Sequence, residues 1–237
     1  NESAMSEKTD FSTVATNPFL EASPLILKYP QFDLIQTEHY LPAFQRGMAE
    51  QLAEIEAIAN QGEDPDFENT IIALELSGQL LDRVSRVFFS MSSAHTNDEI
   101  RSLQQQLAPQ LAAHSDAILL NRALFARIQT LFDQRQELPL EPEALRLLEQ
   151  YHLDFVRAGA ALTESEQDRM REINAEMATL QTQFNQNVMS EANDLAIVVD
   201  TGEEMAGMDE ALKQAANEEA AERGLPGKYV IPLLNTS

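Results

Sequence analysis

Apolar residues recur at steps of three and four along most of the chain, and this spacing is typical of helices that bury one face. The first helix is expected to begin between Thr37 and Pro42. A second begins in the sequence EDPDFENT, with Asp64 as the expected N-cap and Pro65 as the first helical residue. Because it carries apolar residues on two faces, the second helix is predicted to be buried on two sides. The apolar positions are Phe44, Met48, Leu52, Ile55 and Ile58 in the first helix, and Phe67, Ile71, Leu74, Gly78, Leu81, Val84 and Phe88, with Ile72, Leu80 and Val87, in the second.

Three further helices follow. Thr96 and Glu99 form a capping box for the first of them, and Pro109 is expected to kink or break it. Pro142 opens the last of the three, which is predicted to end near Gly159. Their apolar positions are Ile100, Leu103, Leu107 and Leu111, then Leu120, Leu124, Ile128 and Leu131, then Leu145, Leu148, His152 and Phe155.

A long helix is predicted after these. Thr163 and Glu166 form its capping box, and the helical pattern runs to about Ala192. Its apolar residues lie at near-heptad steps, which indicates that they belong to a helix core. They are Met170, Ile173, Met177, Leu180, Phe184 and Val188.

The pattern changes at both ends of the chain. Residues 1–16 are polar and read as a flexible leader, and residues 17–36 carry three prolines and are expected to form an extended docking segment. Residues 37–193 form the predicted helical domain. Residues 194–237 contain two strand-like runs, LAIVV and KYVIPLL, on either side of a helix, which predicts a β-α-β appendage. Because two strands alone make no stable sheet, the appendage is expected to continue into a part outside the chain.

Composition narrows the classes of function. The chain has 237 residues, with 16 Lys and Arg against 39 Asp and Glu, which gives a net charge of −23. Nucleic acids and anionic membrane surfaces are therefore not expected as partners. There is no cysteine, which excludes a disulfide frame, a thiolate metal site and a cysteine nucleophile. No apolar run approaches the roughly 18 residues of a transmembrane segment.

The sequence contains few candidates for catalytic or metal-binding residues. The sequence has no G-x-G-x-x-G, P-loop, nucleophile elbow or H-E-x-x-H motif. Glu149 and His152 have the spacing found in di-iron carboxylate bundles, but the second pair of such a site is missing, so a packed histidine is favoured over a metal ligand. His95 precedes a helix N-terminus, where it could meet a ligand or bond to nearby backbone.

The other two histidines, His39 and His114, are expected to be surface or capping residues. The sequence Asn235-Thr236-Ser237 fits a glycosylation sequon, a short match that often arises by chance. From the residues alone we assign no catalytic residue and no metal ligand, and the substrate-binding residues stay unknown.

Several segments together resemble the thimet oligopeptidase and oligopeptidase A family of zinc metallopeptidases, in particular its bacterial peptidyl-dipeptidases. They occur in the family's order and cover nearly everything after the leader. They are NPFL, FDLIQTEHYLPAF, PDFENTIIALELSGQLLDRVSRVFF, AHTNDE, FVRAGAAL, LQTQFNQNV and GLPGKYVIPLLNTS.

The resemblance implies the front portion of an enzyme that releases dipeptides from the C-terminus of oligopeptides. In this family the two histidines of H-E-x-x-H and a later glutamate hold zinc, and the motif glutamate is the general base. Those ligands would lie in a missing C-terminal catalytic portion, the expected partner of this chain, so the chain alone is expected to bind no zinc and to be inactive. The resemblance also implies a mostly α fold: a multi-helix bundle that forms one wall of a neurolysin-like helical ellipsoid and its substrate channel.

Two other functions stay open at this point. The chain could be a standalone acidic helical binding or scaffold domain, or a carboxylate-bridged metal bundle built on Glu149 and His152. Its location is also open: members of the family are mostly cytoplasmic, but the polar leader is also typical of the tether of an exported, periplasmic envelope protein.

Overall fold

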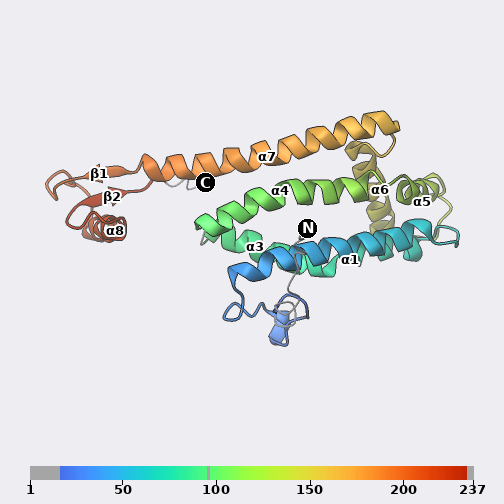
Figure 1. Ribbon diagram of the computed structural model, residues 1–237, viewed down its shortest axis with the longest axis horizontal. Coiled ribbons are helices and arrows are strands. Elements are labelled where there is room, and N and C mark those ends of the chain that lie inside the picture. The colour runs from blue at the N-terminus through green and yellow to red at the C-terminus, as the bar shows by residue number, and fades with distance from the viewer. Residues whose placement is uncertain (1–16, 95–96, 234–237) are drawn as a thin grey trace, which may run out of the picture. The chain divides into compact units, whose positions relative to one another are not determined.

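The computed structural model describes residues 17–94 and 97–233, and the protein is mostly α-helical (Figure 1). The predicted fold class, a multi-helix bundle with a small β element near the C-terminal end, is confirmed. The chain divides into two units, one extending to Thr179 and the other beginning at Leu180. None of the helices in the described ranges has the length and apolar content that a bilayer crossing requires.

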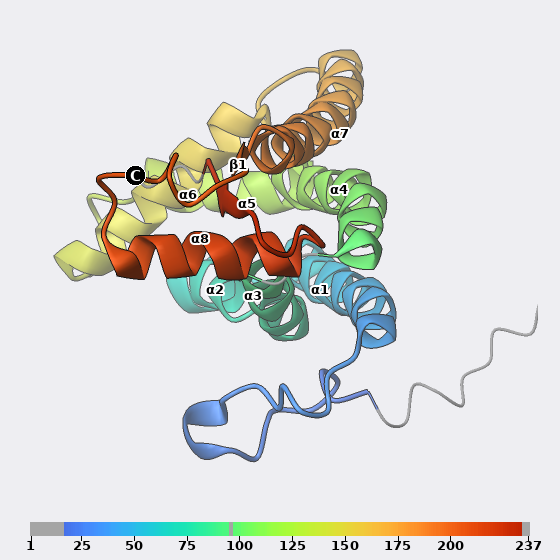
Figure 2. The ribbon, with the colours of Figure 1, turned by 90° about the vertical axis from the view of Figure 1, so that its left-hand side faces the viewer.

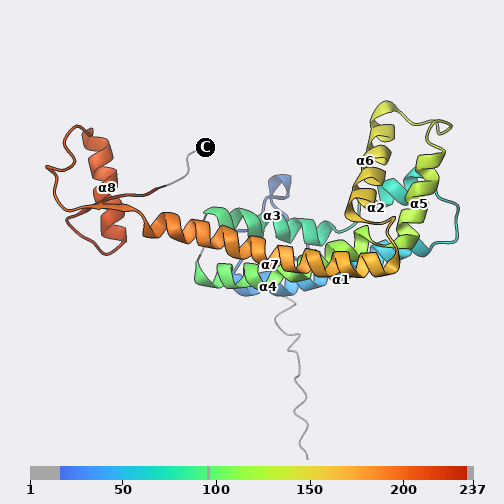
Figure 3. The same cartoon turned by 90° about the horizontal axis from the view of Figure 1, so that it is seen from above.

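The first unit is built from helices that pack around two clusters of apolar side chains. The helices are α1 (Tyr40–Asn60), a π-helical turn (Phe67–Ile72) continued by α2 (Ala73–Glu75), α3 (Gln79–Ala94), α4 (Asp98–Leu119), α5 (Arg122–Asp133), α6 (Pro142–Ala158) and the start of α7 (Glu164–Asp194). In the first cluster, α3 and α4 pack on α1 around Phe44, Val84 and Phe88 (Figure 1). In the second, α5 and α6 pack on one another beside α1, around Ile128 and Phe155 (Figure 3).

Local signals correctly predicted the boundaries of the later helices. Pro142 is the first residue of α6, and Gly159 ends the helix in the left-handed region with a φ of 106°. The carboxylate of Glu166 accepts a 2.9 Å hydrogen bond from the backbone N–H of Thr163, which is one arm of the predicted capping box. The pattern that predicted α7 to run to about Ala192 matches its end at Asp194.

The start of the second predicted helix differs from the prediction. Asp66, not Asp64, is the N-cap: its carboxylate accepts from the backbone N–H of Asn69, whose side chain in turn accepts from the N–H of Asp66. This reciprocal pair satisfies two backbone donors, and Pro65 consequently lies outside the helix. The helix is also interrupted at Gly78, which has a φ of 72°.

The predicted start of α4 was wrong, and of the two effects expected of Pro109 the break does not occur. Asn97 is its N-cap, with the side-chain oxygen 2.9 Å from the backbone nitrogen of Ile100. Thr96, the predicted cap, lies outside the described residues. Pro109 does not break α4, which continues for ten residues to Leu119. Its apolar face, with Leu103 and Leu107 buried in the first cluster, offsets the one backbone donor that Pro109 lacks.

The described residues before α1, 17–39, contain no α-helix (Figure 2). Its first residues dock on the bundle: Phe19 is buried against Tyr40, with ring centroids 5.3 Å apart, and its carbonyl accepts a 2.9 Å hydrogen bond from Nε of Arg83. Farther along, Ile26 and Leu27 are exposed in a short 3-10 turn. The start of the segment, around Phe19, therefore makes the contacts with the helical bundle.

The second unit contains the end of α7, strand β1 (Ile197–Val199), α8 (Glu210–Glu222) and strand β2 (Tyr229–Ile231), in the predicted β-α-β order. The strands pair antiparallel with Val198 opposite Val230. One prediction fails in this unit: the apolar stripe of α7 was expected to be helix core, but Leu180, Phe184 and Val188 are exposed. No described element of the unit covers them.

Candidate functional site

A groove of about 770 Å³ lies between the N-terminal ends of α1 and α4. Two of the segments that carry the family resemblance meet here, because FDLIQTEHYLPAF begins α1 and AHTNDE precedes and begins α4. The lining residues are Thr37, Glu38, Leu41, Pro42, Asp98, Glu99, Ser102, Leu103 and Gln106. Residues from both of these segments therefore line this groove together.

Carboxylates give this groove its electrostatic character. Asp98 and Glu99 lie in the first turn of α4, where the helix dipole stabilises negative charge, and Glu38 lies in a short 3-10 turn (Thr37–His39) directly before α1. Asp98 also pairs with Arg101. Leu41 and Leu103 add apolar surface, so the groove can receive a polypeptide segment that has a positively charged group and apolar side chains. Sequence reasoning missed these residues, because acidic residues at helix starts are equally expected as capping groups.

His39 holds the entrance to α1 in place. Its Nδ1 accepts a 3.1 Å hydrogen bond from the backbone N–H of Gln36, and its carbonyl accepts one of 2.8 Å from the side chain of Asn17. The prediction that His39 is a capping residue is confirmed. His95 and the Asn235 sequon, also singled out from the sequence, lie outside the described residues.

A second groove, of about 500 Å³, lies beside the turn between α2 and α3. Gln51, Ser77 and Tyr151 are among its lining residues, and the Tyr151 hydroxyl donates a 2.5 Å hydrogen bond to Glu75. Burial and this bond to a carboxylate raise the pKa of Tyr151. The carboxylates of Glu75 and Asp82 and the guanidinium of Arg86 also line the groove, so charged groups of both signs lie beside the phenol.

The side chain of His114 contacts that of Gln51. The prediction that His114 is a surface or capping residue is wrong. It is buried in α4, with Nε2 2.7 Å from Oε1 of Gln51 in α1. Among the described residues, its Nδ1 has no hydrogen-bond partner. Burial lowers the pKa of His114, which favours the neutral ring.

The Glu149 and His152 pair does not form a metal site. Nε2 of His152 lies 2.8 Å from Oε1 of Gln129, and its ring stacks on Phe132. Glu149 points to other partners, with oxygens 3.8 Å from Arg135 and 3.7 Å from Arg146. The interpretation of His152 as a packed histidine is therefore confirmed.

The other potential metal ligands among the described residues are also dispersed. Within 17–94 and 97–233, no three His, Asp or Glu side chains come together in a group that could hold a metal ion. The described residues consequently do not offer the three-ligand site that catalytic zinc requires.

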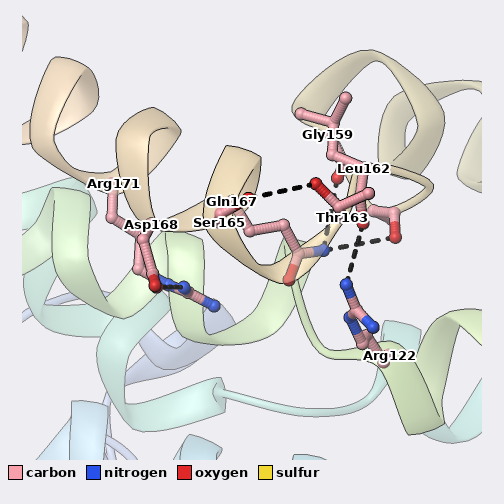
Figure 4. A network of polar contacts seen from close by, with 9 residues as sticks. Arg122, Gly159, Leu162, Thr163, Ser165, Gln167, Asp168 and Arg171 are labelled. Carbon is pink, nitrogen blue, oxygen red and sulfur yellow. Dashed lines mark hydrogen bonds and ion pairs between the residues drawn. The ribbon is translucent and has the colours of Figure 1, made fainter.

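The junction of α6 and α7 holds a polar network whose acceptors are mainly backbone carbonyls (Figure 4). Arg122 donates to the carbonyl of Leu162 at 3.0 Å. The buried Gln167 donates to the carbonyls of Gly159 and Ala160 at 3.3 and 3.2 Å. Because these bonds satisfy backbone carbonyls in the connection that follows α6, the network orients α7 at its start.

Comparison with known proteins identifies the relatives of this chain. Over 224 residues it is 45% identical to the dipeptidyl carboxypeptidase of Salmonella typhimurium, a match that covers 94% of this chain and 33% of that protein. The chain is a relative of the dipeptidyl carboxypeptidases. It is also 46% identical over 221 residues to the dipeptidyl carboxypeptidase of Escherichia coli, covering 93% of this chain and 32% of that protein.

More distant similarity extends to the oligopeptidase A of Haemophilus influenzae, which is 27% identical over 214 residues, or 90% of this chain and 30% of that protein. No family model matches the chain. These matches confirm the resemblance found in the sequence and are consistent with an N-terminal portion of such a protein. The chain spans about a third of the length of the curated relatives it matches.

Proposed function

We propose that this chain is the N-terminal portion of a peptidase that releases dipeptides from the C-terminus of oligopeptides. The observation that carries the proposal is the 45% identity to a dipeptidyl carboxypeptidase along 94% of the chain. The chain contributes one wall of the substrate channel, and the remaining two thirds of such a protein supply the catalytic groups.

In this proposal, the remaining part of the parent protein binds the zinc ion. The sequence contains no H-E-x-x-H motif, and the described residues bring no three potential ligands together. Zinc would activate water and polarise the scissile carbonyl in the remaining part of the protein. We accordingly propose that the chain alone has no catalytic activity.

The groove between α1 and α4 is our candidate for the face that meets the peptide. Its carboxylates, Glu38 and Glu99 among them, attract a cationic side chain or a free amino terminus and repel the peptide's carboxylate end. A peptide would then be oriented with its C-terminus away from this groove. Because the attraction acts between exposed charges, it would weaken as salt concentration rises.

Metal analysis combined with an activity assay tests the proposal. The isolated 237-residue chain and the intact parent protein are each dialysed against zinc and analysed for bound metal and for hydrolysis of a peptide with a free C-terminus. We expect about one zinc ion and activity in the parent, both lost with a chelator, and neither in the chain. Hydrolysis by the purified chain would overturn the proposal that the remaining part of the protein supplies the catalytic groups. A parent without the motif would favour a binding or scaffold domain instead.

A further inference from the structure

One face of α7 carries an exposed row of large apolar side chains. Leu180, Phe184 and Val188 are 54, 67 and 49% exposed. At about 100° per residue these three positions lie within an arc of roughly 80° on one side of the helix. We call these three residues the α7 face. Met189, also exposed at 47%, lies roughly half a turn away from Leu180 and outside this face.

The charge pattern of α7 indicates that this face does not meet water in the functional protein. From Met177 to Ser190 the helix carries no charged residue, although the chain as a whole has a net charge of −23. The first turns of the same helix are rich in Glu, Asp and Arg. Depletion of charge around large apolar side chains is the compositional mark of the buried part of an interface.

The unit that contains the α7 face has little interior of its own. Its buried apolar side chains within the described residues are Met205, Ala216, Ala220 and Val230. Its sheet has two strands, with Ile197 and Val198 of β1 exposed. A two-stranded sheet and a core this small do not hold a unit together, so further apolar burial must come from elsewhere.

We infer that the α7 face is the surface on which the rest of the parent polypeptide packs. The inference rests on the proposed function, because it needs a parent with the additional two thirds that the relatives possess. A segment in the same polypeptide has a high effective concentration at this face. A second copy of the chain is disfavoured because two bodies of charge −23 repel each other.

The absence of cysteine from the chain allows a direct test. Phe184→Cys is made in the isolated chain and in the intact parent, and alkylation of the thiol by iodoacetamide is followed by the mass of the labelled peptide. Because Phe184 is 67% exposed, its replacement removes little packing within the chain. Met189→Cys, on the same helix but outside the α7 face, is the matched control.

We expect the thiol introduced by Phe184→Cys to react about tenfold or more slowly in the parent than in the isolated chain, with a much smaller difference for the control. Equal rates at position 184 in the two proteins would overturn the inference. So would slow reaction in the isolated chain together with a dimeric mass by light scattering, because a second copy would then occupy the face.

This readout is independent of hydrolysis. An inactive parent that protects position 184 contradicts the proposed function alone, and an active parent that leaves position 184 reactive contradicts only the assignment of the face.

Discussion

The imidazole of His152 lies on the ring of Phe132, with 3.7 Å between the ring centroids and 6° between the planes. The stack joins α6 to α5 next to the second apolar cluster. It also explains why the Glu-x-x-His spacing carries no metal chemistry, because the ring is held between an aromatic face and Gln129.

Replacing this histidine therefore tests a structural role. We expect His152→Ala to lower the free energy of unfolding by about 1–3 kcal/mol, because the stack and the hydrogen bond are both lost. Denaturant unfolding of the chain measures the change. Glu149→Gln is the control and is expected to cost less than about 1 kcal/mol, since its ion pairs are partly exposed. Loss of bound metal from the intact parent in His152→Ala would contradict this role.

Gly47 lies where α1 and α3 approach closely. A Cβ at this position would lie 2.8 Å from the backbone nitrogen and 2.9 Å from the Cα of Leu81. Gly47→Ala is expected to destabilise the protein by about 1–3 kcal/mol, although alanine favours helix, because backbone cannot move aside as a side chain can. Thermal unfolding compares it with Gly62→Ala, where a Cβ meets nothing within 4 Å. If both variants are at least as stable as wild type, the close helix contact is wrong.

Because of the capping box at the π-helical turn, Asp66 is expected to contribute more to stability than Asp64. Asp66→Ala is expected to cost about 1 kcal/mol, because the backbone N–H of Asn69 loses its acceptor. Asp64→Ala should change the stability by less than about 0.5 kcal/mol, since Asp64 contributes a backbone carbonyl to Asn69 and that group stays. Urea midpoints of the two variants give the comparison. A larger loss for Asp64→Ala would restore Asp64 as the cap.

His114 predicts a dependence of stability on pH. Its pKa is lowered by burial, so below about pH 6.5 the unfolded chain binds the proton more readily than the folded one. Its contribution to stability is complete above the unfolded pKa and falls as the pH drops below it. We expect the unfolding free energy of the wild type to fall relative to that of His114→Gln as the pH is lowered from about 7.5 to about 5. A constant difference would mean that His114 is not buried in its neutral form.

The helices that could be predicted are those with strong local signals. Pro142 and Gly159 delimit α6 through their own backbone preferences, and no distant contact is needed. Asp64 and Asp66 compete two residues apart, and the choice depends on a hydrogen bond from Asn69 that a sequence pattern does not rank.

The burial of His114 could not be predicted, because it depends on Gln51 in another helix, 63 residues away. The acidic groove was missed for a similar reason. Glu38 and Asp98 are far apart in sequence and become neighbours only when α4 packs beside α1. Periodicity located the stripe of α7 correctly, but whether a stripe is covered depends on the rest of the protein.

The chain is proposed to belong to a peptidase that removes residues two at a time from a free C-terminus. The most direct measurement is mass spectrometry of the products that the intact parent forms from one peptide of defined sequence. We expect successive losses of C-terminal dipeptides, and no reaction when the C-terminus is amidated. Loss of single residues, cleavage at internal bonds without dipeptide release, or equal hydrolysis of the amidated peptide would contradict it.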